Sequence, residues 1–245
     1  MKYMGSKARI AKYIVPIIQS YIDKLGDKCH GYLEPFCGGC NVIDKISCKN
    51  KYANDNNKYL IALLEQAQTD ISVFPETISE ETYYDVKSYP ERYADWFVGL
   101  VGFCSFGARF FQGYPRGFKN DGVTPRDMPH EFISNLIKQA PNLSGIQFKC
   151  YDFQQLNPYL KNWVIYCDPP YKGVKQYDSK PFPYDKYYDW CRLAGQNNVV
   201  LCSEYWMPDD FKCIWEMPIK SMLNQTTPVD KVERLFIYNG TYLGA

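Results

Sequence analysis

The sequence predicts an α/β protein: a doubly wound sheet interrupted by a separate, mostly helical block. Short apolar strands alternate with amphipathic helices in the first and last parts of the chain, which is typical of parallel sheets covered by helices. Between about residues 72 and 146 this alternation stops, and helical segments surround a loop rich in Gly, Arg and aromatic residues. Two further strands near the end, 212–215 and 232–238, are expected to close the sheet as an antiparallel pair.

The first predicted element is a helix over about 8–25. Ser6 can cap it, its apolar residues recur at helical spacing, and Pro16 should kink or divide it. The elements that follow before the insertion are a strand at 32–34, a tight turn at 36–40 into a short helix ending at Ile46, a strand at 51–53 and a helix at 58–68.

The insertion and the last part of the chain are read in the same way. Helical segments are predicted at 80–86, 91–104 and 130–139. The sheet then resumes with a strand at 148–151, a strand at 163–167, a helix at 184–195 and a strand at 198–202. We therefore expect residues 1–71 and 147–245 to form one domain and residues 72–146 to form a smaller inserted domain.

Composition excludes several classes of protein. The 245 residues carry 28 Lys+Arg against 27 Asp+Glu, a formal charge of +1, so any nucleic-acid surface must be local rather than global. No apolar run reaches the roughly 18 residues of a spanning helix, and the N-terminus lacks a signal-peptide core. We expect a cytoplasmic protein, of prokaryotic or viral origin, with no membrane partner.

The ten cysteines are expected to be mostly reduced thiols, because a reducing compartment disfavours disulfides. The only C-x-x-C pair is Cys37 and Cys40, and the two histidines, His30 and His130, stand far apart. A structural zinc site is therefore not expected, and no metal is predicted.

Acidic residues at the predicted strand ends are the main indication of a site. In doubly wound sheets, ligands bind beyond the carboxyl ends of the strands. Five acids stand at or just after such ends: Glu34, Asp55, Asp152, Asp168 and Glu204. Ser203, Glu204 and Tyr205 fit a base-binding role and an ordinary strand end equally well.

The first strand leads into the turn Gly38-Gly39, where backbone can approach a ligand closely. Asp55 follows Glu34 by 21 positions, a spacing that suits a carboxylate binding a ribose diol. The glycines do not form G-x-G-x-x-G, and the chain has no G-x-x-x-x-G-K-[ST], so dinucleotide and P-loop sites are disfavoured.

The segment Asp168-Pro169-Pro170-Tyr171 is the sharpest signal. Its prolines cannot continue a sheet ladder, which leaves the Pro169 carbonyl available beside the Asp168 carboxylate. Two acceptors and the ring face of Tyr171 suit the exocyclic amine of a planar base. A plain proline turn explains the same residues, and the residues alone leave the two interpretations nearly balanced.

Five elements in order resemble the Dam-type (class alpha, D12) DNA adenine-N6 methyltransferase family over nearly the full chain. They are Tyr3-Met4-Gly5-Ser6-Lys7, Glu34-Pro35-Phe36-Cys37-Gly38-Gly39, Asn54-Asp55-Asn56, Tyr151-Asp152-Phe153 and Asp168-Pro169-Pro170-Tyr171. Ser6 and Tyr151 each replace a glycine of the family pattern. The resemblance implies a Rossmann-like methyltransferase sheet with antiparallel C-terminal strands and an inserted target-recognition domain.

The same resemblance implies the partners and the roles of individual residues. It implies S-adenosylmethionine as methyl donor and double-stranded DNA as substrate. The implied donor-binding residues are Tyr3, Lys7, Glu34, Phe36, Gly38, Asp55, Asp152, Phe153 and Asp168. The implied catalytic residues are Asp168, Pro169, Pro170 and Tyr171, and the candidate DNA-contacting residues of the insertion are Arg109, Tyr114, Arg116 and Lys119.

Other functions remain open at this stage. Cytosine-N4 methylation, RNA adenine methylation and a catalytically inactive DNA-binding relative share most of these features. A cysteine-based oxidoreductase would need an acidic thiol at Cys37. The recognition sequence, a restriction partner and the oligomeric state are not determined by these residues.

Overall fold

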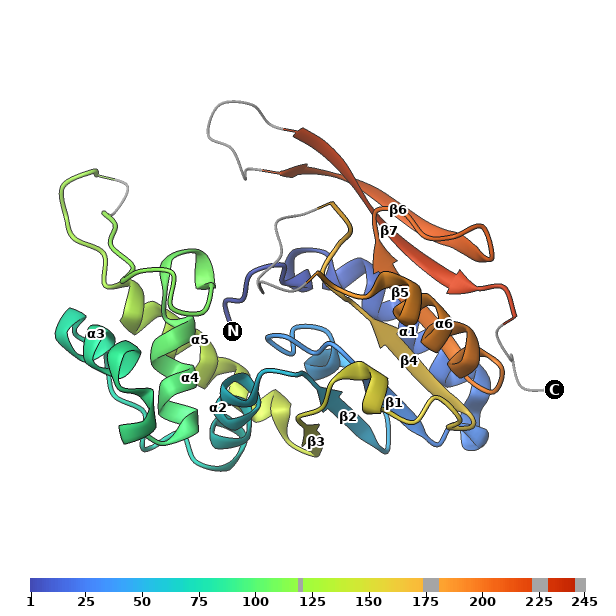
Figure 1. Ribbon diagram of the computed structural model, residues 1–245, viewed down its shortest axis with the longest axis horizontal. Coiled ribbons are helices and arrows are strands. Elements are labelled where there is room, and N and C mark those ends of the chain that lie inside the picture. Colours follow the sequence, from blue (N-terminus) through green and yellow to red (C-terminus); the bar gives the residue numbers. More distant parts are fainter. Residues whose placement is uncertain (119–120, 174–180, 222–228, 241–245) are drawn as a thin grey trace. The chain divides into compact units, whose positions relative to one another are not determined.

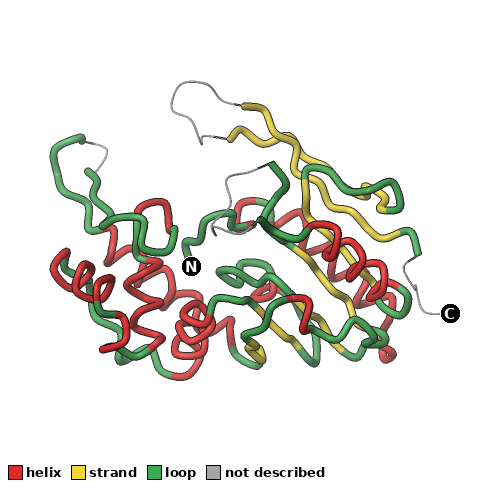
Figure 2. Tube along the Cα trace, in the orientation of Figure 1, coloured by secondary structure: helices red, strands yellow, loops and turns green. Residues whose placement is uncertain are grey.

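The computed structural model describes residues 1–118, 121–173, 181–221 and 229–240. The chain folds into two compact units, each built from several segments. Unit 1 comprises Met1–Ala11, Cys37–Ile46 and Asp55–Cys150, and unit 2 comprises Lys12–Phe36, Ser47–Asn54 and Tyr151–Ala245. Figure 2 shows that helices dominate the inserted part of the chain, whereas strands gather in the other part.

Unit 2 contains a mixed sheet in the order β2-β1-β4-β5-β7-β6. The strands β2, β1, β4 and β5 run parallel, and β7 pairs antiparallel with both β5 and β6. This confirms the predicted α/β fold with an antiparallel C-terminal pair. The strand bounds are Gly31–Glu34 (β1), Lys51–Asn54 (β2), Trp163–Cys167 (β4), Val199–Glu204 (β5), Phe211–Ser221 (β6) and Val229–Tyr238 (β7).

The strand order reverses between β1 and β4. From β1 the chain moves to β2 on one side, and it later returns to place β4 on the other side of β1. A ligand of a doubly wound sheet binds at such a reversal, outside the carboxyl ends of the strands. The strand ends at this position carry Glu34 and, one residue after β4, Asp168.

Helices cover both faces of this sheet (Figure 1). The helix α6 (Tyr184–Gly195) places Tyr187, Cys191 and Ala194 in the core formed with side chains of β1, β4 and β5. The helix α1 (Ala11–Leu25) buries an apolar stripe that includes Ile14 and Ile18. Every residue of β1 and β5 is buried, as expected for strands covered on both sides.

Unit 1 is mainly helical. Its helices are α2 (Lys58–Thr69), α3 (Glu80–Ser88), α4 (Asp95–Phe103) and α5 (Met128–Gln139), followed by the strand β3 (Ile146–Lys149). Side-chain caps fix three helix starts: Asn57 for α2, Ser79 for α3 and Asp127 for α5. Gly99 lets α4 approach α2, because a Cβ there would lie 2.1 Å from the Tyr59 carbonyl oxygen.

The N-terminal prediction was partly wrong. The long helix begins at Ala11, and Ser6 instead caps a short 3-10 helix, Lys7–Arg9. Pro16 lies inside α1 without dividing it, five residues after the helix start. The expected short helix near Ile46 is a 3-10 turn over Ile43–Lys45.

Later boundaries also differ from the sequence prediction. The strand before Asp152 ends at Lys149 rather than at residue 151, and α4 begins at Asp95 rather than at 91. The compact units do not follow the predicted boundaries at 72 and 146, since unit 1 also takes in segments on either side of the insertion. The strand at 163–167 and the helix at 184–195 are confirmed.

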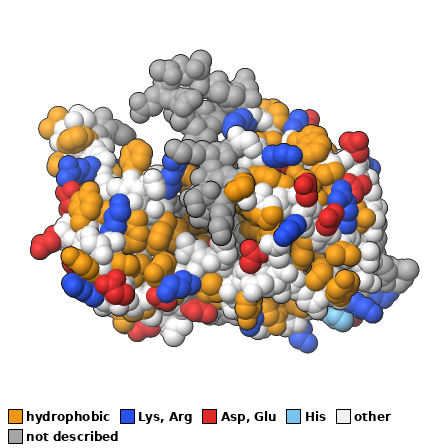
Figure 3. Space-filling model, viewed as in Figure 1, with side chains coloured by type: hydrophobic (Ala, Val, Ile, Leu, Met, Phe, Trp, Pro, Cys, Tyr) orange, Lys and Arg blue, Asp and Glu red, His pale blue; other side chains and the backbone are white. Residues whose placement is uncertain are grey.

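No helix in the described ranges is both long and apolar enough to cross a bilayer. Acidic and basic side chains are interspersed on the face shown in Figure 3, in keeping with the net charge of +1.

The contact of α4 with α2 generates a stability prediction. Gly99→Ala should lower the free energy of unfolding by about 1–3 kcal/mol, because the new methyl group meets backbone that cannot rotate away. Urea unfolding followed by circular dichroism measures the change. Gly117→Ala is the matched control, since its Cβ would meet only the flexible Met128 side chain, at 3.2 Å. Equal stabilities of the two variants would contradict the close α2–α4 packing.

Candidate active site

The turn after β4 presents its acidic side chain at the surface of unit 2. Asp168 is half-buried, Pro169 is buried, and Pro170 and Tyr171 are half-buried. Within the described part of the chain, the Pro169 carbonyl accepts no hydrogen bond. The turn therefore carries a half-buried carboxylate next in sequence to a carbonyl that accepts no hydrogen bond from the described residues.

Tyr171 is held by a side chain from a distant strand. Its hydroxyl donates a 2.8 Å hydrogen bond to Glu233 of β7, and its ring meets that of Tyr205 edge to face, with centroids 4.7 Å apart. Burial and the nearby Asp168 carboxylate raise the pKa of Tyr171 well above its usual value. The hydroxyl consequently stays protonated and remains a donor.

The backbone around this turn is anchored at two further points. The Lys172 N–H donates to the Glu204 carboxyl group at 3.1 Å, and the Tyr184 hydroxyl donates to the Pro170 carbonyl at 3.0 Å. Sequence analysis left Glu204 undecided and missed Tyr184 and Glu233. The position of Glu204 at the end of a strand was the one available signal, since nothing in the sequence around Tyr184 or Glu233 points to the turn.

Acidic and phenolic groups gather at the carboxyl ends of β1 and β4. Glu34 is only 2% exposed, and it accepts a 2.8 Å hydrogen bond from the Tyr32 hydroxyl. Burial is the main reason why the pKa of Tyr166 is raised. The negative charge of Asp168 raises it further, and that of Glu34 has a smaller effect. The parallel pairing of β1 with β4 brings the ends of the two central strands together.

The predicted aromatic donor-binding residues of unit 2 form one cluster. The ring centroids of Phe36 and Phe153 are 5.5 Å apart, and Phe182 lies 5.7 Å from Phe36 and 5.5 Å from Phe153. Phe153 is 4% exposed and belongs to the core, whereas Phe36 is half-buried. Phe36 therefore has the more accessible ring of the two predicted residues.

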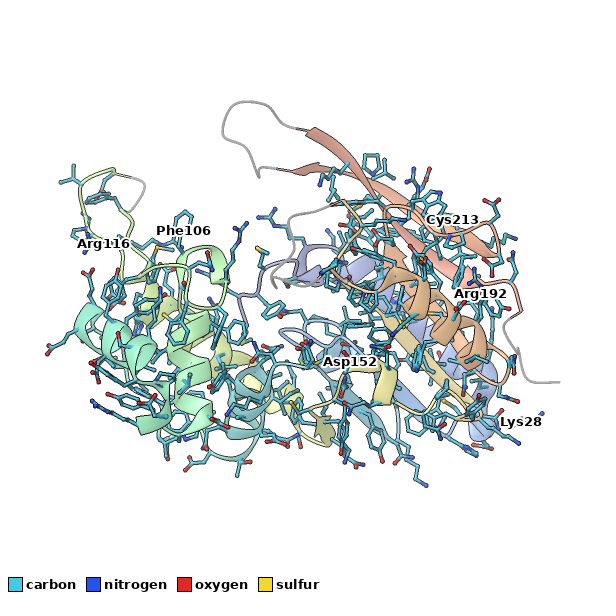
Figure 4. All side chains as sticks on the ribbon, in the orientation of Figure 1. Lys28, Phe106, Arg116, Asp152, Arg192 and Cys213 are labelled. Atoms are coloured by element: carbon cyan, nitrogen blue, oxygen red, sulfur yellow. The ribbon has the colours of Figure 1, made fainter. Side chains whose placement is uncertain are left out.

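Asp152 has a local structural task. Its carboxylate accepts from the Gln154 N–H at 2.9 Å, and the Gln155 side chain accepts from the Asp152 N–H at 3.0 Å. This capping box starts the 3-10 helix Phe153–Gln155. Figure 4 labels Asp152. The carboxylate has acceptor sites in addition to the one used by the cap.

Asn54 is a residue that sequence reasoning did not single out. It is fully buried. Its amide donates to the carbonyls of Pro35 and Tyr151, both at 2.9 Å, and accepts from the Tyr151 N–H at 3.0 Å. One side chain thus joins the segment after β1 to the segment that carries Asp152. The asparagine in the pattern Asn54-Asp55-Asn56 was the available signal.

Unit 1 contains the glycine turn and the second predicted acid. Asp55 accepts from the Gly38 N–H at 3.2 Å and from the Asn57 N–H at 3.1 Å. Gly38 has a φ of +46°, and a Cβ there would lie 2.8 Å from the Tyr3 ring. The structure therefore brings Tyr3, Gly38 and Asp55 together, and Asp55 fixes the turn that the sequence had linked to it only by spacing.

Lys7 is also in unit 1 and is unusually buried for a lysine, at 7% exposure. Its ammonium group donates to the Gly5 carbonyl at 3.3 Å. The ammonium group is thus held beside the backbone of the Tyr3-containing segment.

The candidate DNA-contacting residues differ in their accessibility. Arg116 is 72% exposed and forms an ion pair with Glu80. Arg109 is half-buried and contacts the Met4 sulfur, and the Tyr114 hydroxyl donates to the Ile78 carbonyl at 2.8 Å. Lys119 lies outside the described residues. Arg116 is therefore the more accessible of the two predicted cations that the structure describes.

The aromatic residues of this loop divide into two groups. Phe110 stacks on Tyr59 with centroids 5.5 Å apart, and Phe111 packs edge to face on Tyr83. Phe106 and Phe118 are instead 65% and 63% exposed. Figure 4 shows Phe106 and Arg116 on the segment that follows α4. The sequence analysis did not single out Phe106.

Three cysteines from separate elements form a cluster in the core. The sulfur atoms of Cys167, Cys191 and Cys202 lie within 4.8 Å of one another. Burial raises the pKa of Cys167 and Cys191, so these thiols are neutral and pack as small apolar groups. All ten cysteines of the chain are thiols, in agreement with the expectation from the sequence.

A mostly parallel sheet followed by an antiparallel pair, with acids and aromatic rings at the strand reversal, is consistent with the α/β fold of methyltransferases. The D12 class N6 adenine-specific DNA methyltransferase family matches residues 3–189. The match covers more than half of the chain, and the protein belongs to this family.

The chain is also similar to the type II methyltransferase M.FokI of Planomicrobium okeanokoites. The two are 23% identical over 197 residues, which make up 70% of this chain and 28% of that relative. The chain therefore spans less than a third of the length of the relative that it matches.

The contacts of Asn54 generate a second stability prediction. Asn54→Ala should lower the free energy of unfolding by about 1–3 kcal/mol, because it removes the partner of the buried Pro35 carbonyl and of two partly buried backbone groups of Tyr151. Chemical denaturation measures the loss. The control is Asn50→Ala, which removes one exposed hydrogen bond to the His30 carbonyl. A loss no larger than that of the control would show that Asn54 does not link these segments.

Proposed function

We propose that the protein transfers a methyl group from S-adenosylmethionine to the N6 amine of adenine in double-stranded DNA. The observation that carries the proposal is the turn after β4, where the half-buried Asp168 precedes the Pro169 carbonyl, which accepts no hydrogen bond from the described residues. Membership of the D12 class family supports adenine as the target base and DNA as the substrate.

The residues present suit the methyl donor in chemical terms. A Cβ at Gly38 would meet the Tyr3 ring. Because glycine has no Cβ, the backbone at position 38 can lie close to this ring. The Asp55 carboxylate already accepts two N–H groups and has further lone pairs for ribose hydroxyls. In unit 2, Phe36 and Asp152 offer a ring and a carboxylate for the donor's adenine. In unit 1, the Lys7 ammonium group would bind the carboxylate of the donor's methionine part.

When bound, the donor supplies an electrophilic methyl carbon attached to a positively charged sulfur. The amine nitrogen would attack this carbon and displace the sulfur. The exocyclic amine of adenine is a poor nucleophile, because its lone pair is delocalised into the ring. Hydrogen bonds from its two N–H groups to Asp168 and to the Pro169 carbonyl favour a pyramidal nitrogen whose lone pair is localised. Positioning and electrostatics thus supply the catalysis.

The charges balance through the same groups. The methylated nitrogen carries the positive charge that the sulfur loses, and it then releases one of its protons. The Asp168 carboxylate can accept this proton and pass it to water, so the carboxylate is unchanged at the end of each turnover. No covalent bond to the protein is required.

The target base must leave the duplex to reach the turn, at a cost of about a few kcal/mol. The Tyr171 ring is fixed by Glu233 and Tyr205 and would stack on the extruded base. Arg116, with the exposed rings of Phe106 and Phe118 on the same loop region, would contact phosphate or bases of the duplex.

Loss of the turn's carboxylate should abolish catalysis. Asp168→Ala should reduce methyl transfer to DNA by at least about 100-fold, because one acceptor for the amine is removed. The measurement is labelled-methyl transfer followed by nucleoside analysis of the product. N4-methylcytosine as the product, preferential methylation of RNA, or full activity of the variant would each contradict the proposal.

The Arg116–Glu80 pair generates a prediction for DNA binding. Arg116→Ala should weaken binding and reduce the slope of log K against log[salt] by about 1, because one phosphate contact is lost. Glu80→Gln should have the opposite effect on affinity, since it frees the guanidinium. Fluorescence anisotropy at several salt concentrations measures both. Arg92→Ala is the control, because Arg92 is exposed and lies over the Tyr89 ring.

A further inference from the structure

Two buried glutamates lie beyond residue 189, where the family match ends, and both contact the catalytic turn of unit 2. Glu204 is the last residue of β5 and is 1% exposed, and Glu233 is in β7 and is 7% exposed. Glutamate is rarely this buried unless it has hydrogen-bond partners. The partners of these two show what each side chain does.

Glu233 acts on the aromatic end of the turn. Its Oε2 accepts the Tyr171 hydroxyl at 2.8 Å, and the Tyr171 ring is also held by the edge-to-face contact with Tyr205. A ring with both its hydroxyl and its face fixed loses the freedom to rotate. The ring is therefore already oriented before a base arrives.

Glu204 acts on the backbone that leaves the turn, and it uses both oxygens. Oε2 accepts the Lys172 N–H at 3.1 Å, and Oε1 accepts the Tyr205 N–H at 2.7 Å. This bidentate contact ties the residue after Tyr171 to the residue after β5. Arg234, beside Glu233 on β7, donates to the Tyr205 carbonyl at 2.6 Å, which completes the link from the turn to the antiparallel pair.

We propose that Glu204 and Glu233 are positioning residues of the methyl-transfer site, which fix the backbone and the Tyr171 ring of the Asp168–Tyr171 turn from β5 and β7. This inference rests on the proposed function of that turn. It assigns to the C-terminal antiparallel strands a part in catalysis, because β7 delivers Glu233 and Arg234 beside the end of β5.

The two glutamates should respond differently to the same conservative change. In Glu233→Gln the amide oxygen can still accept the Tyr171 hydroxyl, so the contact survives. In Glu204→Gln one of two acceptors becomes an NH2 group that faces a backbone N–H. Replacement by glutamine should therefore be tolerated at 233 and harmful at 204, a contrast that burial alone does not produce.

The experiment measures single-turnover methylation with saturating donor, on a duplex whose target site has first been found by sequencing modified bases. Glu233→Ala, Glu204→Ala and Glu204→Gln should each slow the chemical step about 10- to 100-fold with the KM for donor within about threefold. Glu233→Gln should stay within about threefold of the wild type.

A double-mutant cycle tests whether Glu233 works through the Tyr171 hydroxyl. In a Tyr171→Phe background, Glu233→Ala should cost less than about threefold, because the contact it removes is already absent. A second readout is 2-aminopurine fluorescence at the target position, which rises when the base leaves the stack. This rise should be smaller in Glu233→Ala than in Glu233→Gln.

Asp189→Asn is the matched control, since it removes one negative charge from an exposed side chain of α6, 71% accessible. Circular dichroism must show that each variant is folded. If an alanine variant does not fold, the glutamine variants still test the inference. Equal effects of glutamine at both positions, or additive effects of Glu233→Ala and Tyr171→Phe, would overturn the inference.

The proposed function and this inference fail in different ways. If the wild-type protein makes no N6-methyladenine, the proposed function fails. If the wild type is active and Asp168→Ala is not, but Glu204 and Glu233 variants keep wild-type rates, only the positioning role is refuted.

Discussion

The parallel pairing of β1 with β4 is the constraint on which the site in unit 2 depends. Gly31 faces Trp163 across this pair, and a Cβ at Gly31 would lie 2.4 Å from the Trp163 ring. The absence of a side chain there allows the indole to cover the start of the pair. With the register set, Glu34 and Asp168 reach the same edge of the sheet, at the point where the strand order reverses.

This edge concentrates buried acids and phenols. Glu34 accepts from Tyr32, and Glu233 accepts from Tyr171, so each phenol serves as a neutral donor to a carboxyl group. Burial raises the pKa of both tyrosines and thereby preserves these donors. This edge of the sheet thus carries carboxyl groups whose positions are fixed by hydrogen bonds from tyrosine hydroxyls.

Much of the fold was predictable because its signals are local. The strand at 163–167 and the helix at 184–195 have the predicted bounds, since apolar runs and helical periodicity are read within a few residues. The boundaries that were wrong depend on other contacts. Ser6 was expected to cap the long helix, but its side chain caps a separate 3-10 turn, and no local pattern distinguishes the two.

The sequence by itself determined the order of the motifs and which chemical groups the turn carries, because Asp168, its two prolines and Tyr171 are adjacent in the chain. Tertiary structure alone decided what holds that turn in place. Glu204 and Glu233 are separated from it by 30 residues or more, and their contacts arise only when β5 pairs with β4 and β7 pairs with β5. A buried carboxyl group contacting a remote backbone or hydroxyl leaves no periodicity or spacing in the sequence, so the folded chain was needed to reveal it.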